Sequence, residues 1–203
     1  MSNLQTKVIA LFVEGDTEIE FYKALINHLR TKNDSPFTCN FEYKNMRGVG
    51  NYKKDALRRF NDIKRNYPGC NIYVFLCYDT DVFELSKKPP VNMSEVKKIL
   101  LQNGARKVEF IKAQKSIEDW FLIDYPGIIK YLRLPSRTPK EAGTGLTVLK
   151  KLFIKAHRIY SKGGKADGLI EHLDITKIKT HICPSLRTLC KCIGLKCDQI
   201  CNK

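Results

Sequence analysis

The sequence predicts an α/β fold, with a four-stranded, mainly parallel sheet flanked by helices and followed by a basic helical extension. Three observations predict this class. Short apolar runs that suit buried strands alternate along the chain with segments of helical periodicity, which favours parallel strands joined by right-handed crossovers. Acidic residues directly follow two of the apolar runs. From Trp120 onward the pattern is mostly helical and rich in lysine and arginine.

The charge of the chain is unevenly distributed. The 203 residues carry a formal net charge of +15. Residues 1–100 contain 16 basic and 12 acidic side chains, whereas residues 101–203 contain 20 and 9. We therefore predict a catalytic domain at residues 1–124 with acids concentrated at one rim, and a basic helical extension at 125–203 packed on it, an arrangement that suits a metal ion and a polyanionic partner such as nucleic acid. A solvated lysine surface is the alternative interpretation.

The hydropathy of the chain bears on its location. No apolar run has the length of a membrane span, and no secretory leader precedes the first strand. We therefore expect a cytoplasmic protein with no membrane partner.

The first predicted strand and helix place an acidic turn at a sheet edge. Residues 7–13 are almost entirely apolar, as in a strand buried on both faces, and helical spacing begins after Gly15. Glu14 follows the strand directly, on the edge where open α/β sheets bind ligands, and Glu18 lies in the first helical turn. Alternatively, both glutamates serve only to stabilise the start of the helix.

A second acidic pair lies near the end of the predicted strand at residues 71–83. Asp79 and Asp81 are separated by one residue, so in an extended chain their carboxylates point to the same face. Together with Glu14 on a neighbouring strand they form a group of hard oxygen ligands that suits Mg²⁺ or Mn²⁺. Alternatively, the aspartates cap the element that follows.

The segment between these strands offers phosphate contacts. After a predicted strand at residues 37–43, a glycine-containing loop carries Arg47, which could neutralise a phosphate. Residues 52–67 then form a predicted helix with one basic face. Its candidate nucleic-acid-binding residues are Lys53, Lys54, Arg58 and Arg59.

The fourth strand is predicted at residues 106–112, after a helix at 95–102. Glu118 and Asp119 follow its carboxyl end, so either could extend the carboxylate group toward a second metal ion. Further on, residues 146–159 are helical, and the loop at 160–165 contains Lys162 and Lys165. Either lysine could neutralise charge on a scissile phosphate, or both could simply be exposed.

These motifs resemble the TOPRIM domain of topoisomerases, primases and the OLD-type and RloB-type nucleases. Glu14, Gly15, Thr17 and Glu18 match the first TOPRIM motif, and Asp79 and Asp81 match the second. The segment 116–124 is similar to one found in RloB-like proteins. The resemblance implies a Rossmannoid sheet, a catalytic lysine as in OLD-like nucleases, and a role in antiviral defence beside an ATPase partner.

The last part of the chain is rich in cysteine. His181, Cys183, Cys190 and Cys192, with Cys197 and Cys201, provide enough ligands for zinc, but they lack paired Cys-x-x-Cys knuckles. We favour the interpretation that these cysteines are buried, reduced thiols. Disulfides are the least expected state in a cytosolic chain.

The sequence thus predicts a magnesium-dependent endonuclease, a hydrolase acting on DNA or on RNA such as tRNA. Glu14 would act as general base or metal ligand, Asp79 and Asp81 as metal ligands, and Glu18 and Glu118 as ligands of a second metal. A nucleic-acid-binding or regulatory subunit and a primase-like nucleotidyl transferase are the alternatives. A homodimer is an open alternative to a monomer.

Overall fold

The structure is built on one four-stranded parallel sheet. It is a computed structural model that describes residues 6–31, 38–85, 89–162 and 168–195. The strand order is β2-β1-β3-β4, and every neighbouring pair is parallel. The predicted α/β class is therefore confirmed. The strands are β1 (Lys7–Val13), β2 (Cys39–Asn45), β3 (Asn71–Asp79) and β4 (Lys107–Ala113).

Helices connect the strands and complete the chain. Among the described residues, no helix combines the length and the apolar character that a membrane crossing requires. The α-helices are α1 (Asp16–Thr31), α2 (Tyr52–Asn66), α3 (Asp81–Leu85), α4 (Met93–Gln102), α5 (Ile117–Phe121), α6 (Tyr125–Tyr131), α7 (Gly145–Lys155) and α8 (Ile175–Cys192). The 3-10 turns are η1 (Val49–Asn51), η2 (Leu122–Asp124) and η3 (Ile170–His172).

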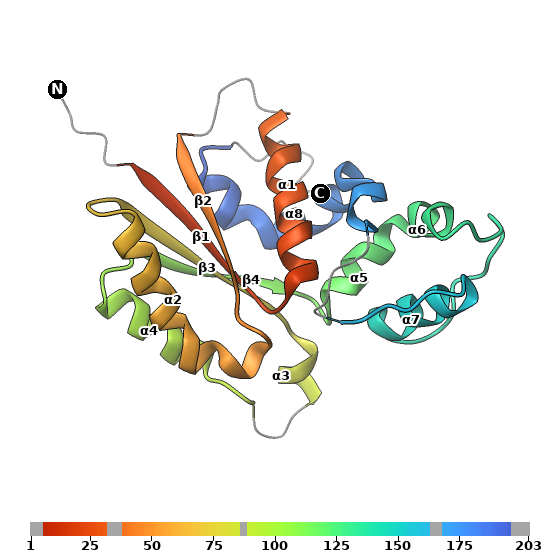
Figure 1. The fold of residues 1–203 in the computed structure, drawn as a ribbon, viewed down its shortest axis with the longest axis horizontal. Helices are drawn as coiled ribbons and strands as arrows, with labels where there is room; N and C mark the ends of the chain where they lie inside the picture. The colour runs from red at the N-terminus through yellow and green to blue at the C-terminus, as the bar shows by residue number, and fades with distance from the viewer. Residues whose placement is uncertain (1–5, 32–37, 86–88, 163–167, 196–203) are drawn as a thin grey trace.

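β1 lies inside the sheet and is buried on both faces, which explains its unbroken apolar sequence. Ile9, Leu11 and Val13 face one hydrophobic cluster, which also contains residues of α1, α7 and α8. The intervening Val8, Ala10 and Phe12 face a second cluster with residues of α2 and α4. Figure 1 shows these two helical layers on opposite faces of the sheet, with α5, α6 and α7 beyond the carboxyl ends of the strands.

The helices after residue 125 share a core with the sheet. Ile128 of α6, Leu149 of α7 and Leu186 of α8 belong to the same buried cluster as Leu11 of β1. Lys7 also donates a hydrogen bond of 2.9 Å to the carbonyl of Cys192, across nearly the full span of the described chain. The extension therefore packs against the sheet, and the boundary at residue 124 stays a prediction.

The second and third strands differ from their predicted boundaries. The second strand covers 39–45 rather than 37–43, and the third ends at Asp79 instead of continuing to Phe83. After Asp79 the amide of Asp81 still donates to the carbonyl of Lys115, but α3 begins there. Phe83 is apolar because it packs beside Tyr78, and a short apolar run does not distinguish a strand from a helix.

The strand order creates a crevice between β1 and β3. From β1 the chain passes through α1 to β2 on one side, and from β2 it passes through α2 to β3 on the other side. Open α/β sheets bind ligands where the strand order reverses in this way, at the carboxyl ends of the strands.

Candidate active site

Glu14 and Asp79 lie together at the carboxyl ends of the two central strands. Glu14 follows the last residue of β1, and Asp79 is the last residue of β3. The amide of Asp79 donates a hydrogen bond of 2.9 Å to Oε1 of Glu14. The structure therefore brings these two predicted site residues into direct contact, although they are far apart in sequence.

Asp79 connects three parts of the chain. Its side chain is buried, with an exposed fraction of 3 %. Oδ1 accepts a hydrogen bond of 2.9 Å from the amide of Ile117 at the start of α5. Oδ2 lies 2.9 Å from Nζ of Lys162, which is 32 % exposed. Of the two candidate lysines, Lys162 is thus at the site, and Lys165 lies outside the described residues.

Two further glutamates are buried beside this pair. Glu18 lies in the first turn of α1 with 5 % exposure, and Glu118 lies in α5 with 1 % exposure. Tyr160 donates a hydrogen bond of 3.2 Å to Oε1 of Glu118. Within the described part of the chain, Oε2 of each glutamate is buried without a hydrogen-bond partner. Such orphaned carboxylate oxygens are costly and call for a cation or a proton.

The structure distinguishes between Glu118 and Asp119. The Asp119 carboxylate closes a capping box at the start of α5, where its Oδ2 accepts from Oγ of Ser116 at 2.9 Å. Asp119 is therefore a structural residue, whereas Glu118 faces the group of acids. Of the two predicted alternatives, Glu118 is the one that the structure brings to the acids, and its role as a metal ligand stays a prediction.

The electrostatics of the site are dominated by burial. Burial raises the pKa of Glu14, that of Glu18 to about 7 and that of Asp79 to about 8, in spite of Lys162. Burial by itself would lower the pKa of Lys162, but the carboxylates of Asp79, Glu118 and Asp81 together raise it. The lysine stays charged while the acids compete for too few positive charges.

Asp81 lies at the edge of this group rather than within it. It is the first residue of α3, and its Oδ1 accepts a hydrogen bond of 2.7 Å from the amide of Val82. Because β3 ends at Asp79, the expected alternation of an extended Asp-Thr-Asp segment does not apply. Asp81 is near enough to raise the pKa values of Glu14 and Lys162.

No ready-made metal-ligand group is present in the described ranges: no three histidine, cysteine, aspartate or glutamate residues there are arranged to hold an ion. The Asp79 carboxylate forms an ion pair with the ammonium of Lys162.

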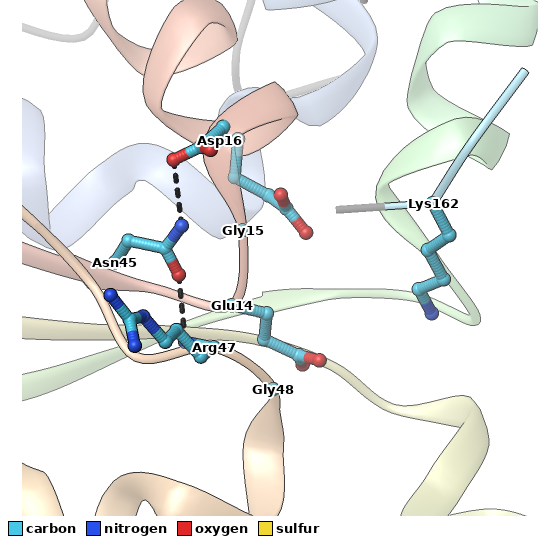
Figure 2. Close-up of a pocket in the computed structure, with 8 residues that line it drawn as sticks. Glu14, Gly15, Asp16, Asn45, Arg47, Gly48 and Lys162 are labelled. Atoms are coloured by element: carbon cyan, nitrogen blue, oxygen red, sulfur yellow. Dashed lines mark hydrogen bonds between the residues drawn. The ribbon is translucent and has the colours of Figure 1, made fainter. Parts of the chain in front are cut away.

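A pocket of about 470 Å³ opens beside the carboxylates. Figure 2 shows Glu14 on one side, with Lys162 across the pocket and Arg47 on the β2 side. Asn45 fixes this loop, since it donates 2.7 Å to Oδ1 of Asp16 and accepts 2.7 Å from the amide of Arg47. The sequence pattern identifies Arg47 but not Asn45 or Asp16, because neither stands in a recognisable motif.

Arg47 has an unusual backbone conformation. Its φ is 57°, and that of Gly48 is 101°, so two successive residues adopt positive φ at the rim of the pocket. The amide of Gly48 donates 2.8 Å to the carbonyl of Glu14, which ties this loop to the end of β1. A strained loop next to buried acids is typical of a ligand site.

The basic residues of α2 lie outside this pocket. Lys53 pairs with Glu95 at 3.4 Å and Arg58 with Asp55 at 3.0 Å, so part of their charge is neutralised. Lys54 and Arg58 line a separate shallow pocket on the outer face of the helix. Arg59 is half-buried, and its Nε has no hydrogen-bond partner among the described residues. The structure thus presents α2 as a basic surface separate from the acids.

The cysteine-rich segment is described only in part. Cys183 of α8 is disulfide-bonded, contrary to the expectation of reduced thiols there. Cys190 is buried in the core, as predicted, and His181 Nδ1 lies 2.8 Å from the carbonyl of Lys177. Cys197 and Cys201 lie outside the described residues, so zinc binding stays a hypothesis.

Comparisons of the chain with models of protein families, with curated proteins and with solved structures found no match. The resemblance to TOPRIM proteins therefore stays a prediction based on the motifs.

Proposed function

We propose that this chain is a metal-dependent phosphodiesterase that acts on nucleic acid, with a TOPRIM-like catalytic centre. One observation carries the proposal: Glu14, Glu18, Asp79 and Glu118 are gathered at the carboxyl ends of the central strands around the ammonium of Lys162. Three buried acids and the partly buried Glu14 share one lysine, so positive charge is lacking at the site, and a divalent cation commonly supplies it.

The residues present fit magnesium or manganese. Both ions prefer carboxylate oxygen, and the buried Oε2 atoms of Glu18 and Glu118 have no partner among the described residues. Glu14 and Asp79 would hold the ion, with Glu118, Glu18 or Asp81 completing a second position. When bound, such an ion activates water and stabilises the leaving oxygen of a phosphodiester.

In this proposal the residues of the chain itself have different roles in the reaction. Glu14, whose pKa is raised by burial, is a stronger base than an exposed carboxylate and is suited to accept a proton. Lys162 lies across the pocket from Glu14, so it is the cation placed to neutralise charge that develops on a phosphate bound there. Arg47 also lines the pocket, but its guanidinium points away from Lys162 (Figure 2). The basic surface of α2 and the overall charge of +15 provide contacts to the rest of the backbone.

The decisive experiment is a cleavage assay on single-stranded DNA, duplex DNA and total tRNA, with Mg²⁺, Mn²⁺ or EDTA. We expect cleavage that requires the metal and that falls about 100-fold or more in Glu14→Gln and Asp79→Asn. The control is Asp62→Asn, which removes a carboxylate near the surface of α2. Equal cleavage by all three variants would assign the activity to a contaminant and refute the proposed site.

A nucleic-acid-binding subunit is the second candidate function. The observation that favours it is the ion pair between Lys162 and Asp79, which already partly neutralises the central acid. On this alternative the wild-type protein and the acid variants bind nucleic acid with the same salt-sensitive affinity, and none of them cleaves.

A further inference from the structure

A second pocket, distinct from the carboxylate site, is lined by basic side chains. It has a volume of about 560 Å³ and lies between the ends of α6 and α7 and the turn η3. Among the described residues, Lys130, Arg133, Arg158 and His172 line it, and no carboxylate does. We call this group of four the basic pocket. Its size is within the range of small-ligand sites.

The cations of the basic pocket have no acidic partner among the residues that the structure describes. None of the ion pairs between described residues involves Lys130, Arg133 or Arg158. Elsewhere on α7 the contrast is clear, because Lys151 and Lys155 both pair with Glu141. Cations at helix ends do stabilise the helix dipole, but several gathered around one cavity repel each other unless an anion joins them.

Tyr131 contacts two of the side chains that line the basic pocket. The guanidinium of Arg158 lies over the Tyr131 ring, 4.8 Å from its centroid, and the His172 ring lies 4.9 Å away. Nδ1 of His172 is 2.9 Å from the carbonyl of Gly168. A carbonyl only accepts, so Nδ1 carries the proton, and Nε2 is the ring nitrogen left for a ligand.

The backbone at the basic pocket is strained at two positions. α6 and α7 both end in Schellman motifs, in which Leu134 donates to Ile129 and Arg158 donates to Phe153. The residue that must adopt positive φ is Arg133 in the first motif and His157 in the second, with φ of 55° for each. Glycine is the favoured residue there, so the chain retains arginine at a cost in stability. Such a cost is typical of a functional position.

The basic pocket is joined to the carboxylate site. Ring contacts run from Tyr131 to Phe153 and from Phe153 to Tyr160, whose hydroxyl binds Glu118. Arg158 precedes Lys162 by only a short stretch of chain, which spans at most about 14 Å. A nucleic-acid strand bound at Lys162 is therefore long enough to reach Arg158 as well.

We infer that the basic pocket binds a phosphate group of a nucleotide unit, as a second anchoring point for the nucleic acid beside the carboxylate site. The ligand's identity rests on the proposed function, whereas the phosphate chemistry follows from the pocket itself. Lys130, Arg133 and Arg158 supply charge and hydrogen-bond donors.

The test is a binding measurement in EDTA, so that it does not depend on cleavage. Binding of a fluorescein-labelled single-stranded oligonucleotide is measured by fluorescence anisotropy at several salt concentrations. Binding of AMP and of inorganic phosphate is measured by calorimetry. We expect Arg158→Ala to weaken oligonucleotide binding about 5- to 10-fold and to reduce the salt slope by about 0.7 for each phosphate that is no longer neutralised. Arg187→Ala, an exposed arginine on α8, is the matched control and should leave both unchanged.

Arg133→Gly separates loss of the pocket from loss of the fold. Glycine suits the positive φ at this position, so the variant should melt at a higher temperature than the wild type while it binds the oligonucleotide more weakly. If AMP or phosphate binds to the wild type and not to Arg158→Ala, the ligand of the basic pocket is a small nucleotide or free phosphate. If only the oligonucleotide binds, the ligand is a nucleic-acid strand. Affinities within about twofold of wild type in both arginine variants would overturn the inference, even if cleavage is observed.

Discussion

Nζ of Lys162 lies 2.9 Å from Oδ2 of Asp79, although 83 residues separate the two in sequence. This ion pair joins the carboxyl end of β3 to the segment that follows α7. It places a half-exposed cation on a carboxylate that is almost completely buried at the crevice. Replacement of either residue should therefore change how much the other contributes to the unfolding free energy.

The coupling between Lys162 and Asp79 should be detectable in a double-mutant cycle. Lys162→Met should cost about 1–2 kcal/mol of unfolding free energy at about pH 9 in EDTA, where the Asp79 carboxyl is ionised, because it leaves a buried carboxylate without its cation. In an Asp79→Asn background the same change should cost far less. Urea denaturation of the four proteins measures the coupling. The exposed pair Lys53 and Glu95 is the control, with an expected coupling below about 0.5 kcal/mol, and additive effects at Lys162 and Asp79 would contradict the prediction.

Glu18 should make the metal-free protein less stable as the pH rises. Burial raises its pKa from 4.5 to about 7, so the folded state binds this proton more tightly than the unfolded chain does. The contribution of Glu18 to the free energy of unfolding therefore falls between about pH 4.5 and pH 7 and levels off above. Glu18→Gln should remove this dependence. The variant's unfolding free energy relative to that of the wild type should therefore be on the order of 2–3 kcal/mol higher at about pH 8 than at about pH 4. Parallel stability curves of the two proteins over this range would contradict the assignment.

Tyr52 should anchor the two acid-bearing strand ends. Its buried hydroxyl lies 2.9 Å from the carbonyl of Phe12 and also contacts the carbonyl of Cys77, each two residues before a site acid. Tyr52→Phe leaves these carbonyls without a side-chain donor, so we expect a loss of about 1–2 kcal/mol in unfolding free energy. Thermal unfolding measures it. Tyr67→Phe, whose hydroxyl binds Glu42 nearer the surface, is the control and should cost less than Tyr52→Phe.

Gly145 should be essential for the position of α5. A Cβ atom at this residue would lie 2.4 Å from the amide nitrogen of Asp119, inside the capping box that starts the helix carrying Glu118. Gly145→Ala should therefore cost about 1–3 kcal/mol of unfolding free energy and weaken metal-dependent cleavage. Gly50→Ala, where a Cβ meets nothing within 4 Å, is the matched control. Equal stability of the two variants would show that α5 can shift without loss.

The sequence predicted the fold well where local patterns reflect tertiary surroundings. A strand that is apolar throughout, such as 7–13, indicates burial on both faces, and the alternation with helices indicates parallel pairing. The end of β3 was less predictable, because Val82 and Phe83 continue the apolar pattern although they belong to α3. The apolar sequence pattern alone does not show where a strand ends and the chain leaves the sheet.

The candidate site was predictable as far as its acids follow strands. Glu14 and Asp79 could be placed at one edge because parallel strands end on the same side. The contact of Lys162 with Asp79, the contact of Tyr160 with Glu118 and the role of Asn45 depend on how distant loops pack, and no spacing in the sequence encodes them. The assignment of Asp119 to a cap likewise needed its contact with Ser116.

The central place of β1 affects how the chain folds during synthesis. β1 emerges first, but one of its edges pairs with β2, and the other waits for β3, where Lys7 lies opposite Asn71. Until residue 79 is available, the most apolar strand of the protein has an open edge, which is a template for pairing with other chains. Contacts between such distant segments form slowly. Truncated products that end before β3 are therefore expected to aggregate, and the rate of folding depends chiefly on the meeting of β1 and β3.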